Sequence, residues 1–416
     1  MVRSRVTNGA YFEILVIVKA RDIRSRFAGG GFVVFALFLV TLSFPTPARA
    51  YAWMIKHDYA GCNQCHADPS GGSLLTEYGR AQSDFLLRMR YGAEESYEPP
   101  PSAGFLFTAV KLPENLLLGG DVRYVTMSRT ANGATAPVRA FFMQADFAGQ
   151  LSINRFRVAG SIGYAEEGAL LTSLTHAPAK NAVSRAHWIG FDIGADRNWL
   201  LRIGRMNVPF GVRTVEHTLW TRTATRTDTN VSQQHGVTLA YNGSSFRAEA
   251  MFIYGNLQVS PAEYRERGYS AMFEYAAMSH LSVGVSTLVT TAGRNLFFPQ
   301  VPMTRQAHGA FARFSPWKSI VLLSEFDFLA QAPEGAETQT GTVGMLQVDF
   351  EPTQGLHVMA TGETLNSPDG TGAANAYWGS AAWFFLPHFD LRIDAVKQNY
   401  PNFSTTTLLA QVHAFL

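Results

Sequence analysis

Between residues 105 and 416 the sequence alternates, residue by residue, between apolar or aromatic side chains and small or polar ones. In the segment 246–254, FRAEAMFIY, apolar side chains occupy one set of alternate positions, and an arginine and a glutamate fall in the other. A period of two residues is typical of a β-strand, whose successive side chains point to opposite faces of a sheet. No convincing amphipathic helix interrupts this pattern, so the region predicts an all-β structure.

The connections between these segments indicate how the strands are arranged. We predict about sixteen strands, at 116–129, 138–150, 154–165, 186–194, 199–207, 235–242, 245–255, 268–278, 280–291, 306–315, 318–329, 339–350, 355–365, 375–386, 389–399 and 406–416. Short turns, such as 195–198, 315–317 and 387–388, alternate with longer polar loops, such as 166–185 and 208–234. Outer-membrane barrels show this rhythm, because their periplasmic turns are short and their extracellular loops are long. The prediction is a transmembrane antiparallel β-barrel with both ends in the periplasm.

A soluble sandwich or propeller, which also has many short strands, is the rival fold, but it would not explain this rhythm. Charged residues make up 16% of the chain, against ~25% in an average soluble domain. The chain also ends in an apolar strand with Phe415 next to last. Aromatic residues near strand ends are candidates for the interfacial girdles of a barrel, with core packing as the alternative. They are Tyr124, Trp188, Trp199, Tyr254, Trp317, Trp378, Trp383 and Phe415.

Residues 24–50 resemble a secretory signal peptide. Two arginines precede an apolar core from Phe32 to Leu42, and Ala48-Arg49-Ala50 provides a cleavage site. An anchoring helix is the alternative, but this core is shorter than the ~20 residues that cross a bilayer. We therefore expect residues 1–50 to be removed and the mature chain to begin at Tyr51.

The two cysteines of the chain stand in the sequence Cys62-Asn63-Gln64-Cys65-His66. Covalent attachment of haem c needs two thiols one helical turn apart and an adjacent histidine for the iron. A thioredoxin-like motif or a disulfide would be expected within a βαβ pattern, and a zinc site would need two more ligands. We therefore predict one covalent haem c bound by Cys62, Cys65 and His66, with His66 as the proximal iron ligand.

The spacing leaves the sixth iron ligand open among His57, Met54 and Met89. His57 is the narrow preference, with a solvated loop histidine as the competing interpretation. Apolar residues between Leu74 and Met89 are spaced close to one face of a helix. We predict a small α-helical c-type cytochrome domain at 51–98, an extended Pro-rich linker at 99–104 and the barrel at 105–416.

Other functions find little support in the sequence. The formal net charge is +2 and no basic cluster stands out, which excludes a nucleic-acid partner. The histidines at 176, 217, 235 and 308 have unrelated spacings, so no catalytic residue is predicted and a soluble haem enzyme is not indicated.

The signal peptide, the single Cys62-x-x-Cys65-His66 motif, the Pro-rich joint and the barrel together resemble the fused monohaem c-type cytochrome and porin family of the outer membrane. This family is best known as the iron oxidases of iron-oxidising bacteria. The resemblance covers the mature chain in architecture and Cys62 to Gly79 in recognisable sequence. It implies electron transfer between an extracellular donor such as Fe(II) and a periplasmic cytochrome or other soluble carrier, and with it an Fe(II) oxidase activity. The direction of electron flow and the oligomeric state, for which porin trimers are a precedent, stay open.

A single haem cannot span a membrane, so we expect it at the periplasmic mouth of the barrel or in its lumen, where both sides can reach it. The alternative function is a passive solute porin with an appended periplasmic cytochrome domain. In that case the longest loop, 208–234, with Arg213, Arg222 and Arg226, would fold inward as a constriction that favours anions. The competing interpretation is an external loop with solvated charges.

Overall fold

The computed structural model describes residues 52–59, 61–72, 74–92, 100–164, 182–214, 216, 218–297 and 300–416. All of them belong to one structural unit, Thr46–Leu416. The predicted signal peptide at 1–50 lies outside the described residues.

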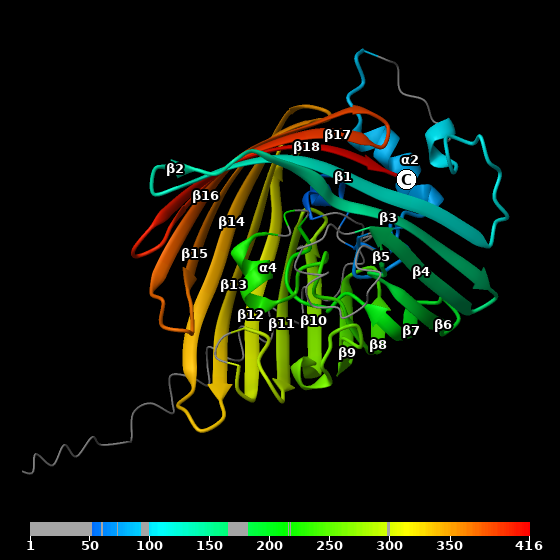
Figure 1. Cartoon of the computed structure of the whole chain (residues 1–416). Coiled ribbons are helices and arrows are strands. Elements are labelled where there is room, and N and C mark those ends of the chain that lie inside the picture. Colours follow the sequence, from blue (N-terminus) through cyan, green and yellow to red (C-terminus); the bar gives the residue numbers. More distant parts are fainter. Residues whose placement is uncertain are drawn as a thin grey trace, which may run out of the picture. The chain divides into compact units, whose positions relative to one another are not determined.

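Sixteen long strands of the described residues form one antiparallel sheet that closes on itself (Figure 1). They are β1 (Leu116–Ala131), β3 (Arg139–Ile153), β4 (Phe156–Tyr164), β6 (His187–Ile193), β7 (Trp199–Met206), β8 (Gln234–Asn242), β9 (Phe246–Gly255), β10 (Arg267–Met278), β11 (Leu281–Ala292), β12 (Met303–Trp317), β13 (Ile320–Pro333), β14 (Gln339–Thr353), β15 (Leu356–Asn366), β16 (Ala373–Leu386), β17 (Phe389–Asn399) and β18 (Ser404–Phe415). Each long strand pairs with its neighbours along the chain, and β1 pairs with β18 from Asp121↔Phe415 to Ala131↔Thr405. Two-residue strands β2 (Ala134–Thr135) and β5 (Ala182–Val183) extend β1 and β4 at the loops. The predicted barrel is confirmed.

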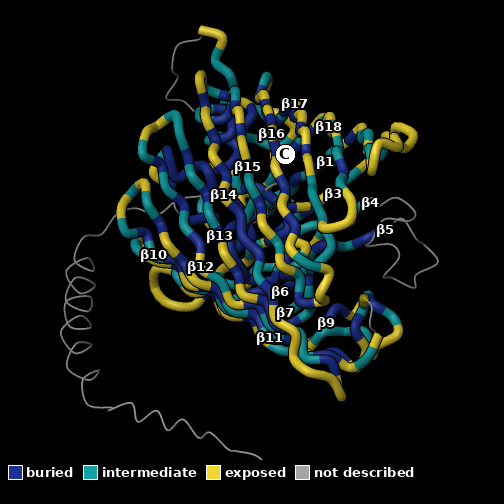
Figure 2. Tube along the Cα trace, turned by 90° about the vertical axis from the view of Figure 1, so that its left-hand side faces the viewer, coloured by how far each residue is buried: buried dark blue, intermediate teal, exposed yellow. Residues whose placement is uncertain are grey.

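The polarity of the wall is the reverse of that of a soluble protein. In β9, Phe246, Phe252 and Tyr254 are exposed, whereas Arg247 and Glu249 are buried. Figure 2 shows the same alternation of exposed and buried positions along the neighbouring strands. An apolar outer face with charged residues inside is the arrangement that lipid around a barrel selects.

Charged side chains inside the wall are held in ion pairs between strands. Arg247 of β9 contacts Glu274 of β10 at 2.6 Å, and Arg313 of β12 contacts the same glutamate. Arg305 of β12 contacts Glu266, the residue before β10, at 2.7 Å. A buried charge without a partner is strongly destabilising, so these pairs allow a polar lumen within a well-packed wall.

Only some of the candidate girdle aromatics face outward. Tyr124, Trp199, Tyr254, Trp317 and Trp383 are exposed, as interfacial aromatics should be. The other three, Trp188, Trp378 and Phe415, are buried on the inner side, where the alternative of core packing applies.

The segment before the barrel consists of short helical pieces. They are η1 (Trp53–His57), α2 (Glu77–Gln82), a π-helical turn η2 (Ser83–Leu87) and η3 (Pro101–Ala103). Two further short pieces lie in the barrel loops, α4 (Trp220–Thr225) and η4 (Ala262–Tyr264). Among the described residues, no helix is both long and apolar enough to cross a membrane.

Where the sequence predicts an extended linker at 99–104, the described part forms the single turn η3. The Ser102 hydroxyl donates a hydrogen bond to Asp84, and the Ser102 carbonyl lies 2.7 Å from Nε2 of His388 in the β16–β17 turn. The joint is therefore folded because it is tied both to the preceding segment and to the barrel.

Candidate functional site in the barrel lumen

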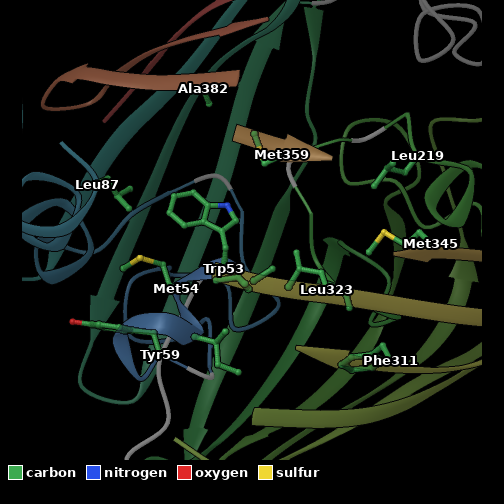
Figure 3. Close-up of a cluster of buried hydrophobic side chains, with 14 of the residues drawn as sticks. Trp53, Met54, Tyr59, Leu87, Leu219, Phe311, Leu323, Met345, Met359 and Ala382 are labelled. Atoms are coloured by element: carbon green, nitrogen blue, oxygen red, sulfur yellow. The ribbon is translucent and has the colours of Figure 1, made fainter. Parts of the chain in front are cut away.

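The segment 52–92 packs against the inner face of the wall. Helix η1 lies against β12 and β13 (Figure 1). Lys56 forms an ion pair with Glu351, and the Trp53 ring lies 4.4 Å from that of His357, centroid to centroid. Trp53 belongs to a buried apolar cluster shared by the segment and the wall, in which Figure 3 shows Leu87, Met359 and Ala382 around it. The segment thus shares its core with the barrel.

Residues Cys62 to His66 form a tight helical turn. The Cys62 carbonyl accepts hydrogen bonds from the N–H groups of Cys65 at 3.3 Å and His66 at 3.0 Å. Both cysteines are buried. The two cysteines and the histidine predicted to bind haem therefore project from a single turn, as covalent attachment requires.

A short extended segment, Leu74 to Thr76, holds this turn in place. His66 pairs with Leu75 in an isolated bridge, and the N–H of Thr76 donates to the Cys65 carbonyl at 2.9 Å. A Cβ on Gly79 would collide with that same carbonyl oxygen, so α2 can pack this closely only with glycine there. The apolar spacing predicts one helix from Leu74 to Met89. The structure instead has the extended segment at Leu74 to Thr76, and α2 begins at Glu77.

A hydrogen bond and an ion pair fix the motif and the residue Asp68 after it to the wall. Nη1 of Arg247 lies 3.3 Å from Sγ of Cys62, and Arg202 of β7 pairs with Asp68 at 2.8 Å. Burial lowers the pKa of His66 to about 4, although Asp68 and a backbone hydrogen bond with Gly72 act in the opposite direction. The imidazole is therefore neutral near pH 7, which is the form that binds a metal.

Cys62 and His66 line a cavity inside the barrel, whose volume open to the centres of water molecules is about 150 Å³. Strands β1, β3, β4, β6 and β18 supply part of the lining, and three arginines, Arg123, Arg185 and Arg213, face it. Cys65 points instead into the shared apolar cluster.

The three candidates for the sixth ligand occupy different places. Met54, 1% exposed, lies in the same apolar cluster as Cys65. Burial and Lys56 lower the pKa of His57 to about 4, and its buried Nε2 has no hydrogen-bond partner among the described residues. Met89 is tied to the wall through its N–H, which donates to the Phe384 carbonyl at 2.9 Å. The structure thus brings Cys62, Cys65 and His66 together. It leaves the choice of sixth ligand open among the three candidates.

The long loop 207–233 between β7 and β8 folds into the lumen. Its helix α4 packs against β13, β14 and β15 (Figure 1), Arg222 pairs with Glu325, and the N–H of Val212 donates to Oε2 of Glu325 at 2.7 Å. Gly211 has a φ of +58°, and a Cβ there would collide with Glu325, so the close approach requires glycine. The inward loop expected of a constriction is confirmed, and the external-loop interpretation is wrong.

Residues that position the motif were missed by the sequence analysis. Arg202, Arg247 and Asp68 come from parts of the chain that meet only when the barrel closes. The alternation indicates that Arg202 and Arg247 face inward, but it carries no signal for which of many inward charges would meet the motif.

No family model and no curated protein matches this chain. Solved structures do match it. A loop-deletion mutant of OmpT from Vibrio cholerae has a TM-score of 0.57 and 9% identity and covers 72% of this chain and 99% of its own. An anion-selective porin from Comamonas acidovorans (TM-score 0.53, 10% identity, 72% and 99% covered) and the outer-membrane channel DcaP of Acinetobacter baumannii (0.52, 13%, 72% and 97%) are also similar.

The wall has the outer-membrane porin fold. The porin fold puts the short turns at the periplasmic end of the wall and the long loops at the outer end. At this low identity the likeness extends to the fold alone.

Proposed function

We propose that this protein is an outer-membrane electron-transfer protein that holds one covalent haem c in its barrel lumen. Electrons would pass between an extracellular donor, with Fe(II) as the first to test, and a periplasmic cytochrome or other soluble carrier. The observation that carries the proposal is the Cys62–His66 turn, from which Cys62 and His66 line a cavity inside the wall.

The residues present fit a haem. The thiols of Cys62 and Cys65 and the neutral imidazole of His66 project from one turn, and Cys62 and His66 border a cavity inside the barrel. When bound, haem supplies one-electron chemistry at a potential set by its axial ligands and surroundings. The chain's own part is to supply the thiols and His66, to shield the site from lipid and to set its electrostatics with the lumen arginines.

The topology supports a route across the membrane. Both β1 and β18 reach the short-turn end of the wall, where Leu416 and Gly120 exchange hydrogen bonds. The motif-bearing segment contacts that same end, since Gln354 in the β14–β15 turn donates to the carbonyl of Arg88 at 2.9 Å. A periplasmic carrier would meet the site from this end, and an extracellular donor would approach past the long loops.

A passive porin with an appended domain is the second candidate. It is favoured by the solved neighbours, whose names speak of porins and channels, and by the inward loop with its arginines. The segment and the loop both occupy the lumen, which favours the first candidate. Liposome swelling with small sugars separates the two, since free permeation supports the porin and a closed lumen supports electron transfer.

Assembly is part of the proposal. One OmpT structure was solved as a trimer, and we propose the same assembly for this barrel in lipid. Light scattering of the purified protein in detergent measures it directly, and a monomeric mass would remove this part.

Haem staining of a denaturing gel tests the proposal. The wild-type band should stain, the Cys62→Ala, Cys65→Ala double variant should not, and His57→Ala, which leaves both thiols in place, should stain as the wild type does. Heat-dependent migration on the same gel verifies that each barrel has folded. A folded wild type without stain would contradict the proposal.

A further inference from the structure

The arginines of the inward loop 207–233 differ in their partners. Arg222 pairs with Glu325, and Arg226 pairs with Glu266. Arg213 donates only to two backbone carbonyls, those of Val208 and Thr227. Among the described residues, no carboxylate lies within ion-pair distance of Arg213.

Arg213 nevertheless carries a charge in a largely enclosed place. Burial and the neighbouring Arg222 lower its pKa to about 10, although Glu249 and Asp68 act in the opposite direction, and the guanidinium is protonated at neutral pH. The backbone carbonyls, together with Glu249 and Asp68 beyond ion-pair distance, offset part of the cost of this charge, but an enclosed cation normally has an anion in direct contact. A bound anion in contact with Arg213 would therefore occupy the space that its guanidinium faces.

That space is the cavity of Cys62 and His66. Thr214 lines it as well, and its buried Oγ1 has no hydrogen-bond partner among the described residues. The other two arginines of the lining already have carboxylate partners, Arg123 in Asp121 and Arg185 in Asp146. A guanidinium and a hydroxyl from adjacent residues thus offer an anion-binding pair that has no carboxylate partner among the described residues.

We infer that Arg213 and Thr214 bind a carboxylate of the haem, so that the inward loop and the Cys62–His66 turn hold the cofactor together. Haem carries two carboxylates, and a guanidinium matches a carboxylate in two parallel hydrogen bonds. This inference rests on the proposed function and adds a role for the loop that connects the outer side of the barrel to the site.

A positive charge beside the cofactor favours the reduced state, because reduction adds a negative charge. Removing the charge of Arg213 should therefore lower the midpoint potential without removing the thioether bonds. A purely structural role for Arg213 would leave the potential of folded, haem-loaded protein where it was.

The test is a redox titration of the full-length protein in detergent, after equal haem content has been verified by staining. Arg213→Gln should lower the midpoint potential, and Arg213→Lys, which keeps the charge, should lie closer to the wild type. Arg226→Gln is the matched control, since it removes the same charge from the same loop at a residue that does not line the cavity. If Arg213→Gln fails to fold, Thr214→Ala replaces it, and a lowered potential is again expected.

The outcomes are separable. A wild type without haem overturns the proposed function, and the inference with it. A stained, folded Arg213→Gln with the wild-type potential overturns the inference alone. If that variant instead changes the relative permeation of acetate and glucose in liposomes at an unchanged potential, the loop serves solute carboxylates and the haem assignment of Arg213 is wrong.

Discussion

The barrel wall and the segment inside it are stabilised in different ways. Each of the sixteen described long strands is hydrogen-bonded on both sides, and the wall closes through β1 and β18 without help from the segment. In the described residues of 52–92, by contrast, the longest helix is the six-residue α2. The segment depends on contacts with the wall, such as Lys56–Glu351 and Asp68–Arg202. A local pattern suffices for the wall, whereas the segment takes its structure from its surroundings.

The largest effect is expected from a variant that lacks residues 52–104 but keeps the predicted signal peptide. We expect the wall to assemble, because the strand pairing does not use the segment, and the sugar permeability of liposomes to rise sharply over that of the full chain. Heat-dependent migration and swelling assays measure the two effects. A deletion variant that no longer forms a barrel would make the wall dependent on the segment and break the comparison.

A substitution in the apolar cluster that the segment shares with the wall should destabilise the segment but not the strands. Trp53 is 8% exposed and packs on the His357 and Phe384 rings of the wall. Truncation of a buried aromatic costs about 3–5 kcal/mol, so Trp53→Ala should speed hydrogen exchange at 52–59 while the strands keep wild-type protection. Trp53→Phe, which keeps a ring, is the control and should have a smaller effect. Equal loss of protection in the wall would show that the two regions unfold together.

A charge on the outer face tests the wall itself. Phe252 of β9 is 62% exposed and points away from the lumen. An arginine on the lipid face costs ~2–4 kcal/mol at the midplane and less toward the interface, so Phe252→Arg should lower the free energy of unfolding in lipid vesicles by up to that amount. Phe252→Leu is the apolar control. A change within ~0.5 kcal/mol, as on a soluble surface, would argue against lipid at this face.

The smallest effect is expected from a substitution at the candidate sixth ligand of the haem iron. If His57 is the sixth ligand, His57→Ala should turn a low-spin six-coordinate spectrum into a high-spin one, with little change in stability because the imidazole is only partly buried. The absorption spectrum of the purified protein reports the change. An unchanged low-spin spectrum excludes His57 and transfers the test to Met54→Ala and Met89→Ala.

The wall could be predicted almost completely from the sequence, because alternation and turn residues are local signals. All sixteen long strands occur within a few residues of their expected positions. One predicted turn, 315–317, is wrong: these residues belong to β12, where pairing with β13 shifts between Phe314 and Trp317, and the turn follows at 318–319. Proline is tolerated at such an irregularity near a strand end, so Pro316 does not mark the turn itself.

The side of the wall that an aromatic faces was harder to predict, because it depends on a shift of one residue. Trp188 and Trp199 both stand near strand ends, yet Trp188 is buried and Trp199 exposed. For the site, the motif is local and visible, whereas its contacts with Arg202 and Arg247 depend on the register of distant strands. Only the folded wall brings those charges to the motif.

The central claim is that a haem in the lumen accepts electrons from outside the membrane. The most direct measurement follows haem absorbance in proteoliposomes of known orientation, with Fe(II) or a membrane-impermeant reductant added on the long-loop side. The account predicts reduction of the haem from that side with the vesicle intact. Haem that stays oxidised under these conditions, yet is reduced after detergent lysis, would contradict the transmembrane route and favour a porin with an appended cytochrome.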